Sequence, residues 1–148
     1  MTTVAASLTE MAADQQLTAD GLTYRVQKIH RLPDGGIVGA CGDWPEAYPA
    51  IQWLLGGEAG EPPLFKDASL LVLRPDGTLW MADGHFPLYP LLNTYAAMGN
   101  GAQAAMVVMS CGLSAGEAVK AVSRLDAYTG EAVQLLKLEP QGKRKRLK

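Results

Sequence analysis

The chain begins Met1-Thr2-Thr3-Val4, and removal of Met1 would leave a threonine as the first residue. Initiator methionine is normally removed when the next side chain is small. Thr2 would then have a hydroxyl and a free α-amine on one residue. A hydroxyl is a weak nucleophile that needs a base beside it, and an α-amine can accept its proton near neutral pH. The pair predicts nucleophilic catalysis by Thr2, although an ordinary residue starting a strand explains the same dipeptide.

Four further segments along the chain bear on the same prediction. They are Met11-Ala12-Ala13-Asp14, Val26-Gln27-Lys28-Ile29, Ile37-Val38-Gly39-Ala40-Cys41-Gly42-Asp43 and Leu125-Asp126-Ala127-Tyr128-Thr129-Gly130. In order and approximate spacing they resemble the N-terminal-nucleophile hydrolases of the proteasome β-subunit and HslV type, over nearly all of the chain up to about Leu138. The resemblance implies an α+β fold, a four-layer αββα sandwich of two antiparallel sheets flanked by helices.

Lys28 is an isolated charge among neutral neighbours in Tyr24–Leu32, a segment whose pattern predicts a strand. An inward-facing lysine needs a counter-charge, because burial of an isolated ammonium is costly. We expect Asp14 to supply this charge, since the resemblance places an acidic residue beside the lysine. An ammonium there would lower the pKa of the Thr2 hydroxyl and amine. The alternative is a lysine that faces solvent from the strand.

The segment Gly39-Ala40-Cys41-Gly42-Asp43 matches a G-x-x-G-D turn of the family. The resemblance assigns the oxyanion role to the backbone N–H of Gly39, which would stabilise the charge of the tetrahedral intermediate. A glycine there would let the substrate backbone approach closely. For Gly42 and Asp43 we favour a structural role, as a strand-to-helix turn and a helix N-cap.

Two further family segments are present with one substitution each. Asp126 and Thr129 match a D-x-x-S-G segment in which threonine replaces serine; the resemblance implies that they hydrogen-bond around the N-terminal residue. A helix C-terminal turn is the alternative for both. The G-S-G turn of the family is here Gly99-Asn100-Gly101. Asn100 is still a donor and an acceptor but lacks a hydroxyl. It could slow the enzyme, alter its substrate preference or mark a copy that no longer cuts.

The remaining pattern predicts strands joined by hairpins, and three helices. Pro33–Gly36 and Arg74–Gly77 predict hairpin turns, Glu58–Lys66 a loop, and Phe86–Leu92 an edge or irregular strand because it contains two prolines. We expect strands over Thr2–Ser7, Thr9–Asp14, Tyr24–Leu32, Gly36–Cys41, Ala68–Leu73, Thr78–Ala82, Tyr95–Met98 and Ala132–Leu138, and helices over Trp44–Leu55, Gly101–Gly112 and Ser114–Leu125.

At 148 residues, the length and composition predict one globular domain over residues 1–140, followed by a basic, disordered tail over 141–148. The net charge is −2, but Lys143–Lys148 contains five of the thirteen basic residues, so the rest of the chain is acidic. Such a tail can bind nucleic acid or an acidic partner surface, although a solvated chain end is the interpretation that we favour.

The sequence lacks an apolar run of the roughly 18–20 residues that a membrane span needs, and it shows no secretory signal pattern. We therefore expect a cytoplasmic protein without a membrane association. Cys41 and Cys111 form no recognisable motif, which favours two reduced core thiols over a disulfide. His30 and His85 are too isolated to indicate a metal site. We expect no cofactor, and the chain has no phosphate-binding loop with which to hydrolyse ATP.

Two classes of function remain open from the sequence. The first is a threonine endopeptidase, a subunit of a homo-oligomeric ring that encloses its active sites, acts on peptides or unfolded proteins and works with an AAA+ unfoldase ATPase. The short 58–66 loop and the Met1-Thr2 start favour small HslV-like bacterial or phage relatives over proteasome β subunits. The second is a catalytically silent scaffold or assembly protein of the same fold, for which Asn100 is the evidence. A small-molecule amidohydrolase is a third, weaker alternative.

Overall fold

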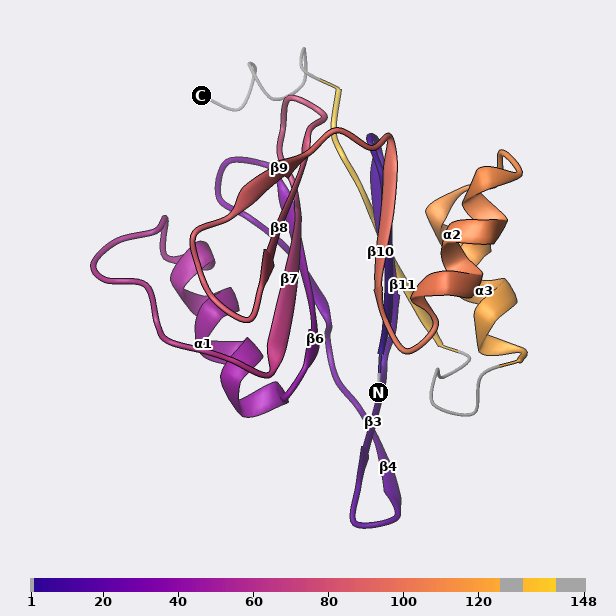
Figure 1. The fold of residues 1–148 in the computed structure, drawn as a ribbon, viewed down its shortest axis with the longest axis horizontal. Helices are drawn as coiled ribbons and strands as arrows, with labels where there is room; N and C mark the ends of the chain where they lie inside the picture. Colours follow the sequence, from indigo (N-terminus) through magenta and orange to yellow (C-terminus); the bar gives the residue numbers. More distant parts are fainter. Residues whose placement is uncertain (1, 126–131, 141–148) are drawn as a thin grey trace.

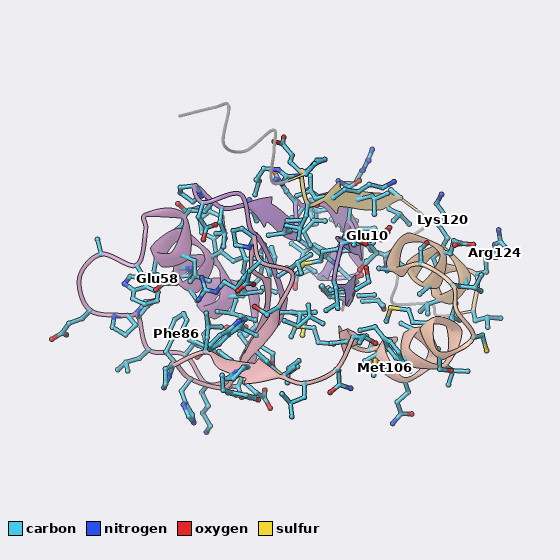
Figure 2. The ribbon with its side chains drawn as sticks, turned by 90° about the horizontal axis from the view of Figure 1, so that it is seen from above. Glu10, Glu58, Phe86, Met106, Lys120 and Arg124 are labelled. Atoms are coloured by element: carbon cyan, nitrogen blue, oxygen red, sulfur yellow. The ribbon has the colours of Figure 1, made fainter. Side chains whose placement is uncertain are left out.

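The computed structural model of the protein describes residues 2–125 and 132–140. Two antiparallel sheets lie face to face, with α1 (Trp44–Leu55) on one outer face and α2 (Ala102–Ser110) and α3 (Ala115–Ser123) on the other (Figure 1). Side chains fill the space between these layers (Figure 2). Of the labelled residues, Glu58 and Phe86 lie on the α1 side, and Met106, Lys120 and Arg124 lie on the α2–α3 side. This four-layer αββα arrangement confirms the predicted fold class.

The first sheet has the strand order β10-β1-β2-β11. Its strands are β1 (Thr3–Ser7), β2 (Glu10–Asp14), β10 (Tyr95–Gly99) and β11 (Val133–Lys137). Both faces of β1 are covered: Val4 and Ala6 belong to the core between the sheets, and Ala5 packs against the helical layer. The strand that follows Thr2 is therefore fixed on both sides.

The second sheet has the order β5-β6-β7-β8-β9. Its strands are β5 (Ile29–Arg31), β6 (Ile37–Gly42), β7 (Ala68–Leu73), β8 (Leu79–Asp83) and β9 (Tyr89–Leu91). The predicted hairpins around Pro33–Gly36 and Arg74–Gly77 are present, and β9 is an edge strand that contains Pro90. Proline is tolerated there because an edge strand need not donate every N–H to a neighbour.

The helices begin close to the predicted residues. Ser114 and Glu117 form the predicted capping box at the start of α3, in which each side chain accepts from the other residue's backbone N–H. Asp43 lies at the N-cap of α1, but its carboxylate accepts no capping hydrogen bond; the N–H groups of Glu46 and Ala47 instead donate to its backbone carbonyl. Asp43 is thus the predicted N-cap residue, without a hydrogen bond from its side chain to the helix.

One long strand predicted from the sequence is instead two short ones. A hairpin of β3 (Gln16–Ala19) and β4 (Leu22–Arg25) extends beyond the two sheets (Figure 1), and the next strand begins only at Ile29. The Val26 N–H closes the hairpin on the Gln15 carbonyl, 2.9 Å away. The prediction of one strand over Tyr24–Leu32 was wrong. Lys28 connects the two sheets here, so its side chain does not follow the in-and-out alternation of a single sheet.

None of the helices in the described ranges is long and apolar enough to cross a membrane. Both cysteines are free; Cys41 is buried, but Cys111 is exposed, so the prediction of a core thiol fails for Cys111. The predicted tail at 141–148 lies outside the described residues.

Candidate active site

A cleft of about 860 Å³ opens at one end of the space between the two sheets. Its walls come from four parts of the chain: the residue before β1, the β3–β4 hairpin, the segment from the end of β6 into α1, and the turn after β10. The lining residues are Thr2, Leu17, Thr18, Ala19, Cys41, Gly42, Asp43, Trp44, Pro45, Tyr48, Gly99 and Asn100. The predicted nucleophile thus lies in the wall of a cleft that could hold an extended peptide.

The turn after β10 holds the backbone of Thr2. The Asn100 N–H donates to the Thr2 carbonyl at 2.7 Å, and the Thr2 residue is only 7% exposed. Gly99 has a φ of +93°, and a Cβ placed on it would overlap the Thr2 carbonyl oxygen. Glycine is thus required at position 99 for two reasons, the left-handed backbone and the close approach of residue 2.

Thr3 is held from two sides. Its N–H donates to Asp14 Oδ1 at 2.9 Å, and its hydroxyl Oγ1 accepts from the Gly101 N–H at 3.2 Å. Thr3 is fully buried. The backbone on both sides of the Thr2–Thr3 peptide is therefore fixed by hydrogen bonds, and Thr2 has little freedom to move in the cleft.

Lys28 and Asp14 form the predicted ion pair. Lys28 Nζ lies 3.0 Å from Asp14 Oδ2, and the two side chains are 1% and 0% exposed. Asp14 Oδ2 also accepts from the Gln16 N–H at 3.1 Å. One carboxylate thus binds the lysine ammonium and, through its other oxygen, the N–H of Thr3. The ion pair is therefore linked, through Asp14, to the residue next to Thr2.

Burial sets the direction of the Lys28 pKa. Desolvation disfavours the ammonium and lowers the pKa below the usual lysine value, while the attraction of the Asp14 carboxylate opposes the shift without cancelling it. Lys28 therefore loses its proton more readily than an exposed lysine. Such a perturbed group beside a cleft is typical of functional sites, although structural ion pairs also show it.

Gln134 of β11 positions the Lys28 backbone and was not identified from the sequence. Its Oε1 accepts from the N–H groups of Lys28 and Ile29, both at 3.3 Å, and its Nε2 donates to the Ile29 carbonyl at 2.8 Å. The segment that joins β4 to β5 is not part of a strand at Lys28, and these side-chain bonds hold its backbone instead. A glutamine in a strand pattern gives no sequence signal for this role.

The oxyanion role predicted for Gly39 is wrong. Gly39 lies in the middle of β6, and a Cβ there would be 2.8 Å from both Met11 Sδ and Val4 Cγ1. The Ala40 N–H donates to the Lys28 carbonyl, so the alternation along β6 directs the Gly39 N–H toward β7, where the sheet uses it. Glycine is needed at position 39 because the two sheets approach closely there, and it does not line the cleft.

Gly42, and not Gly39, is the glycine of this motif that lines the cleft. The Asp43 N–H donates to the Asp67 carbonyl on the β7 side, and the Ala40 N–H points toward Lys28. The strand alternation therefore directs the Gly42 N–H toward the Lys28 side, into the cleft that Gly42 lines. The structural role predicted for Gly42 also holds, since its φ is +100° at the turn from β6 to α1.

Cys41 lines the same cleft but is a poor competing nucleophile. The residue is 8% exposed, and burial raises the pKa of its thiol to about 11. The reactive form of cysteine is the thiolate, which this site disfavours. Asp126 and Thr129 lie outside the described residues, so their predicted contacts with the N-terminal residue stay predictions.

No protein-family model matches the sequence, and no curated protein matches it. Solved structures do match its fold. HslV from Trypanosoma brucei is 17% identical, with 93% of this chain and 99% of that chain covered and a TM-score of 0.70. BPH from Thiobacillus denitrificans is 16% identical, with 94% and 98% covered and a TM-score of 0.64. The same BPH in complex with epoxomicin is 15% identical, with 94% and 99% covered and a TM-score of 0.65.

These likenesses extend over almost the whole of both chains and agree with the resemblance that the sequence motifs indicated. At 15–17% identity they establish the fold of this chain. Its chemistry has to be argued from the residues of the site. The chain has the αββα sandwich fold of the HslV-type proteins.

Proposed function

We propose that the protein is a threonine-type peptidase in which Thr2 becomes the N-terminal nucleophile after cleavage of the Met1–Thr2 bond. The observation that supports this most strongly is the buried Lys28–Asp14 pair. Its carboxylate binds the N–H of Thr3, the residue next to Thr2, and Thr2 itself lines a cleft large enough for a peptide. A buried ion pair is a weak source of stability, so a role beside a reactive residue accounts better for its presence.

In the proposed reaction, the free α-amine of Thr2 accepts the hydroxyl proton while Oγ1 attacks the substrate carbonyl carbon. The carbonyl oxygen becomes an oxyanion, which the Gly42 N–H stabilises. When the tetrahedral intermediate collapses, the peptide C–N bond breaks and the α-ammonium returns its proton to the leaving amine. An ester joins Thr2 to the acyl fragment. Water then attacks this ester with the same amine as base, and Thr2 is regenerated.

Lys28 contributes through its charge in this scheme. A nearby ammonium favours the neutral form of the α-amine and stabilises negative charge on the threonine oxygen as its proton leaves. Asp14 is a positioning residue, since it fixes the ammonium at 3.0 Å and holds the Thr3 N–H at 2.9 Å. Asp126, Thr129 and Asn100 would complete the hydrogen bonding around the amine.

We further propose a homo-oligomeric ring in the cytoplasm that acts on peptides or unfolded proteins, with an AAA+ unfoldase ATPase as partner for folded substrates. The similarity in fold to HslV supports this, and enclosure would keep an exposed nucleophile from degrading proteins at random. A monomer of about 16 kDa in light scattering at micromolar concentration would count against the ring; the chain mass is 15.8 kDa.

Asn100 is the observation that favours a catalytically silent scaffold of the same fold. One contact that holds Thr2 comes from the Asn100 backbone N–H, which a serine would supply equally, and this supports the active peptidase over the scaffold. The small-molecule amidohydrolase stays a second alternative, since an N-terminal nucleophile can attack any activated amide.

Intact-mass measurement before and after treatment with epoxomicin, the ligand of the similar BPH structure, tests the proposal. We expect loss of Met1 and then addition of one inhibitor per chain. Thr2→Ala should abolish both labelling and hydrolysis of fluorogenic peptides while keeping the fold, and Thr2→Ser should keep part of the rate. Peptide hydrolysis by Thr2→Ala at the wild-type rate would disprove the assignment.

A further inference from the structure

Asp43 is the one charged side chain among the described residues that line the cleft. It directly follows Gly42, whose N–H points into the cleft, so its Cα lies about 3.8 Å from that of Gly42. The other lining side chains are uncharged polar or apolar groups at neutral pH. Among the side chains of the described lining residues, Asp43 is therefore the one that can form an ion pair with a cationic group of a ligand.

Within residues 2–125 and 132–140, the Asp43 carboxylate has no structural hydrogen bond or ion pair. It accepts no capping hydrogen bond from α1. The ion pairs in the described part of the chain join Lys28 to Asp14 and Arg74 to Glu58, so neither involves Asp43. Its acidic neighbour Glu46 differs, because the Glu46 carboxylate accepts from the N–H groups of Lys66 and Asp67 at 3.1 and 3.0 Å. Asp43 is exposed in the cleft and has capacity to bind a cation.

Apolar surface surrounds this carboxylate in the cleft. Trp44 and Tyr48 lie on the α1 side, and Leu17 lies on the hairpin side. A lysine or arginine side chain has an apolar stem and a charged head, and such side chains bury the stem while the head meets a polar group. Aromatic faces also attract cations. The combination of an apolar wall and one carboxylate fits a long basic side chain better than a short or acidic one.

We propose that the cleft selects peptides in which lysine or arginine contributes the carbonyl that Thr2 attacks, and that Asp43 determines this choice. The inference rests on the proposed peptidase function for its reaction. In this proposal the attacked carbonyl lies at the Gly42 N–H, which brings the side chain of the same substrate residue within reach of the adjacent Asp43. This assigns a basic substrate class to the cleft.

The hydrolysis test compares two fluorogenic tripeptide coumarin amides that differ only in the last residue, arginine or norleucine. Asp43→Asn keeps the shape and a good N-cap residue. We expect it to lower the arginine-to-norleucine ratio of kcat/KM about fivefold, the upper end for an exposed ion pair, with the norleucine rate changed less than about twofold. Asp67→Asn is the matched control, since Asp67 is exposed nearby but does not line the cleft; its ratio should equal that of wild type.

Two further arms sharpen this comparison. Raising the salt concentration should reduce the arginine preference of wild type and leave the ratio of Asp43→Asn unchanged. Asp43→Lys should reverse the sign of the preference and favour a glutamate peptide over the arginine peptide. Equal slowing of both peptides by Asp43→Asn would overturn the proposal, because Asp43 would then act on the nucleophile and not on the substrate side chain.

A binding arm separates this proposal from the proposed function. Fluorescein-labelled arginine and norleucine peptides are titrated against Thr2→Ala, with fluorescence anisotropy as the readout. We expect about fivefold tighter binding of the arginine peptide, and loss of that difference when Asp43→Asn is added. Equal affinity for both peptides would overturn the selection by Asp43. If wild type shows the preference in binding but cleaves neither peptide, the peptidase function fails and the charge selection stands.

Discussion

Replacing Lys28 by methionine should destabilise the fold and abolish catalysis together. Methionine has a similar length but no charge, so Asp14 keeps its burial and loses the ammonium at 3.0 Å. Removing one partner of a buried ion pair typically costs 3–5 kcal/mol, because the other charge stays in a medium of low dielectric. Asp14 still accepts from the N–H groups of Thr3 and Gln16. These bonds place the expected loss of unfolding free energy at the lower end, about 3 kcal/mol.

Urea denaturation followed by tryptophan fluorescence measures this loss, and a thermal melt should show a Tm lower by about 6–12 °C for a domain of this size. The control is Lys28→Met combined with Asp14→Asn. It removes the buried negative charge while the amide oxygen can still accept from the Thr3 N–H, so it should recover about half of the lost stability. Recovery in the double variant would show that the isolated carboxylate, and not lost packing of Lys28, causes the destabilisation.

The peptidase rate of Lys28→Met should fall about 10²–10³-fold, the range for removal of one stabilising group at a reacting oxygen. Lys28→Arg separates charge from geometry. It keeps the positive charge beside Asp14 and should lose less stability, but its planar guanidinium cannot replace a compact ammonium in a tight site, so its rate should also fall strongly. Wild-type stability and activity in Lys28→Met would refute the reasoning and place this lysine outside the site.

Three further predictions test the site. Asn100→Ser should change the peptidase rate less than about tenfold, because the backbone N–H that holds Thr2 is kept; a nearly silent wild type with strong gain in the serine variant would contradict this. Gly99→Ala should abolish activity and cost about 1–3 kcal/mol of stability, whereas Gly112→Ala, with a similar φ of +88° but open space around it, should lose only stability. In a pH titration, the rate should fall as pH rises through the lowered Lys28 pKa, since the ammonium is lost. A rate that stays constant as the ammonium is lost would contradict the assigned charge.

Local signals in the sequence were sufficient for the elements whose structure is decided locally. The hairpin turns at Pro33–Gly36 and Arg74–Gly77 and the capping box at Ser114 are encoded within a few residues, and each is present. The Lys28–Asp14 pair was also predictable, because an isolated charge in an apolar pattern must find a counter-charge. Its partner came from the resemblance and not from the pattern.

The errors arose where a second sheet decides the structure. Alternation along Tyr24–Leu32 predicted one strand, but Gln134 of β11 fixes the backbone at Lys28 and Ile29 and so breaks it. Gly39 and Gly42 are glycines of one motif with different roles. Gly39 packs against Val4 and Met11 between the sheets, whereas Gly42 lines the cleft. Contacts between distant segments leave no local pattern, so sequence periodicity could not have separated the two glycines.

The glycine at position 39 still matters to the site, through the distance between the sheets. Asp14 and Gly99 belong to one sheet, and Thr2 directly precedes β1 of that sheet; Gly42 belongs to the other sheet, and Lys28 directly precedes its strand β5. The Lys28–Asp14 contact at 3.0 Å therefore depends on how closely the sheets pack, and the missing Cβ of Gly39 permits that approach. Interiors are close-packed and resist change in spacing, so the same core that stabilises the fold also fixes the ammonium beside Asp14. We therefore expect sheet packing to set the geometry of the proposed nucleophile, so that a core residue without any contact to substrate can change the rate.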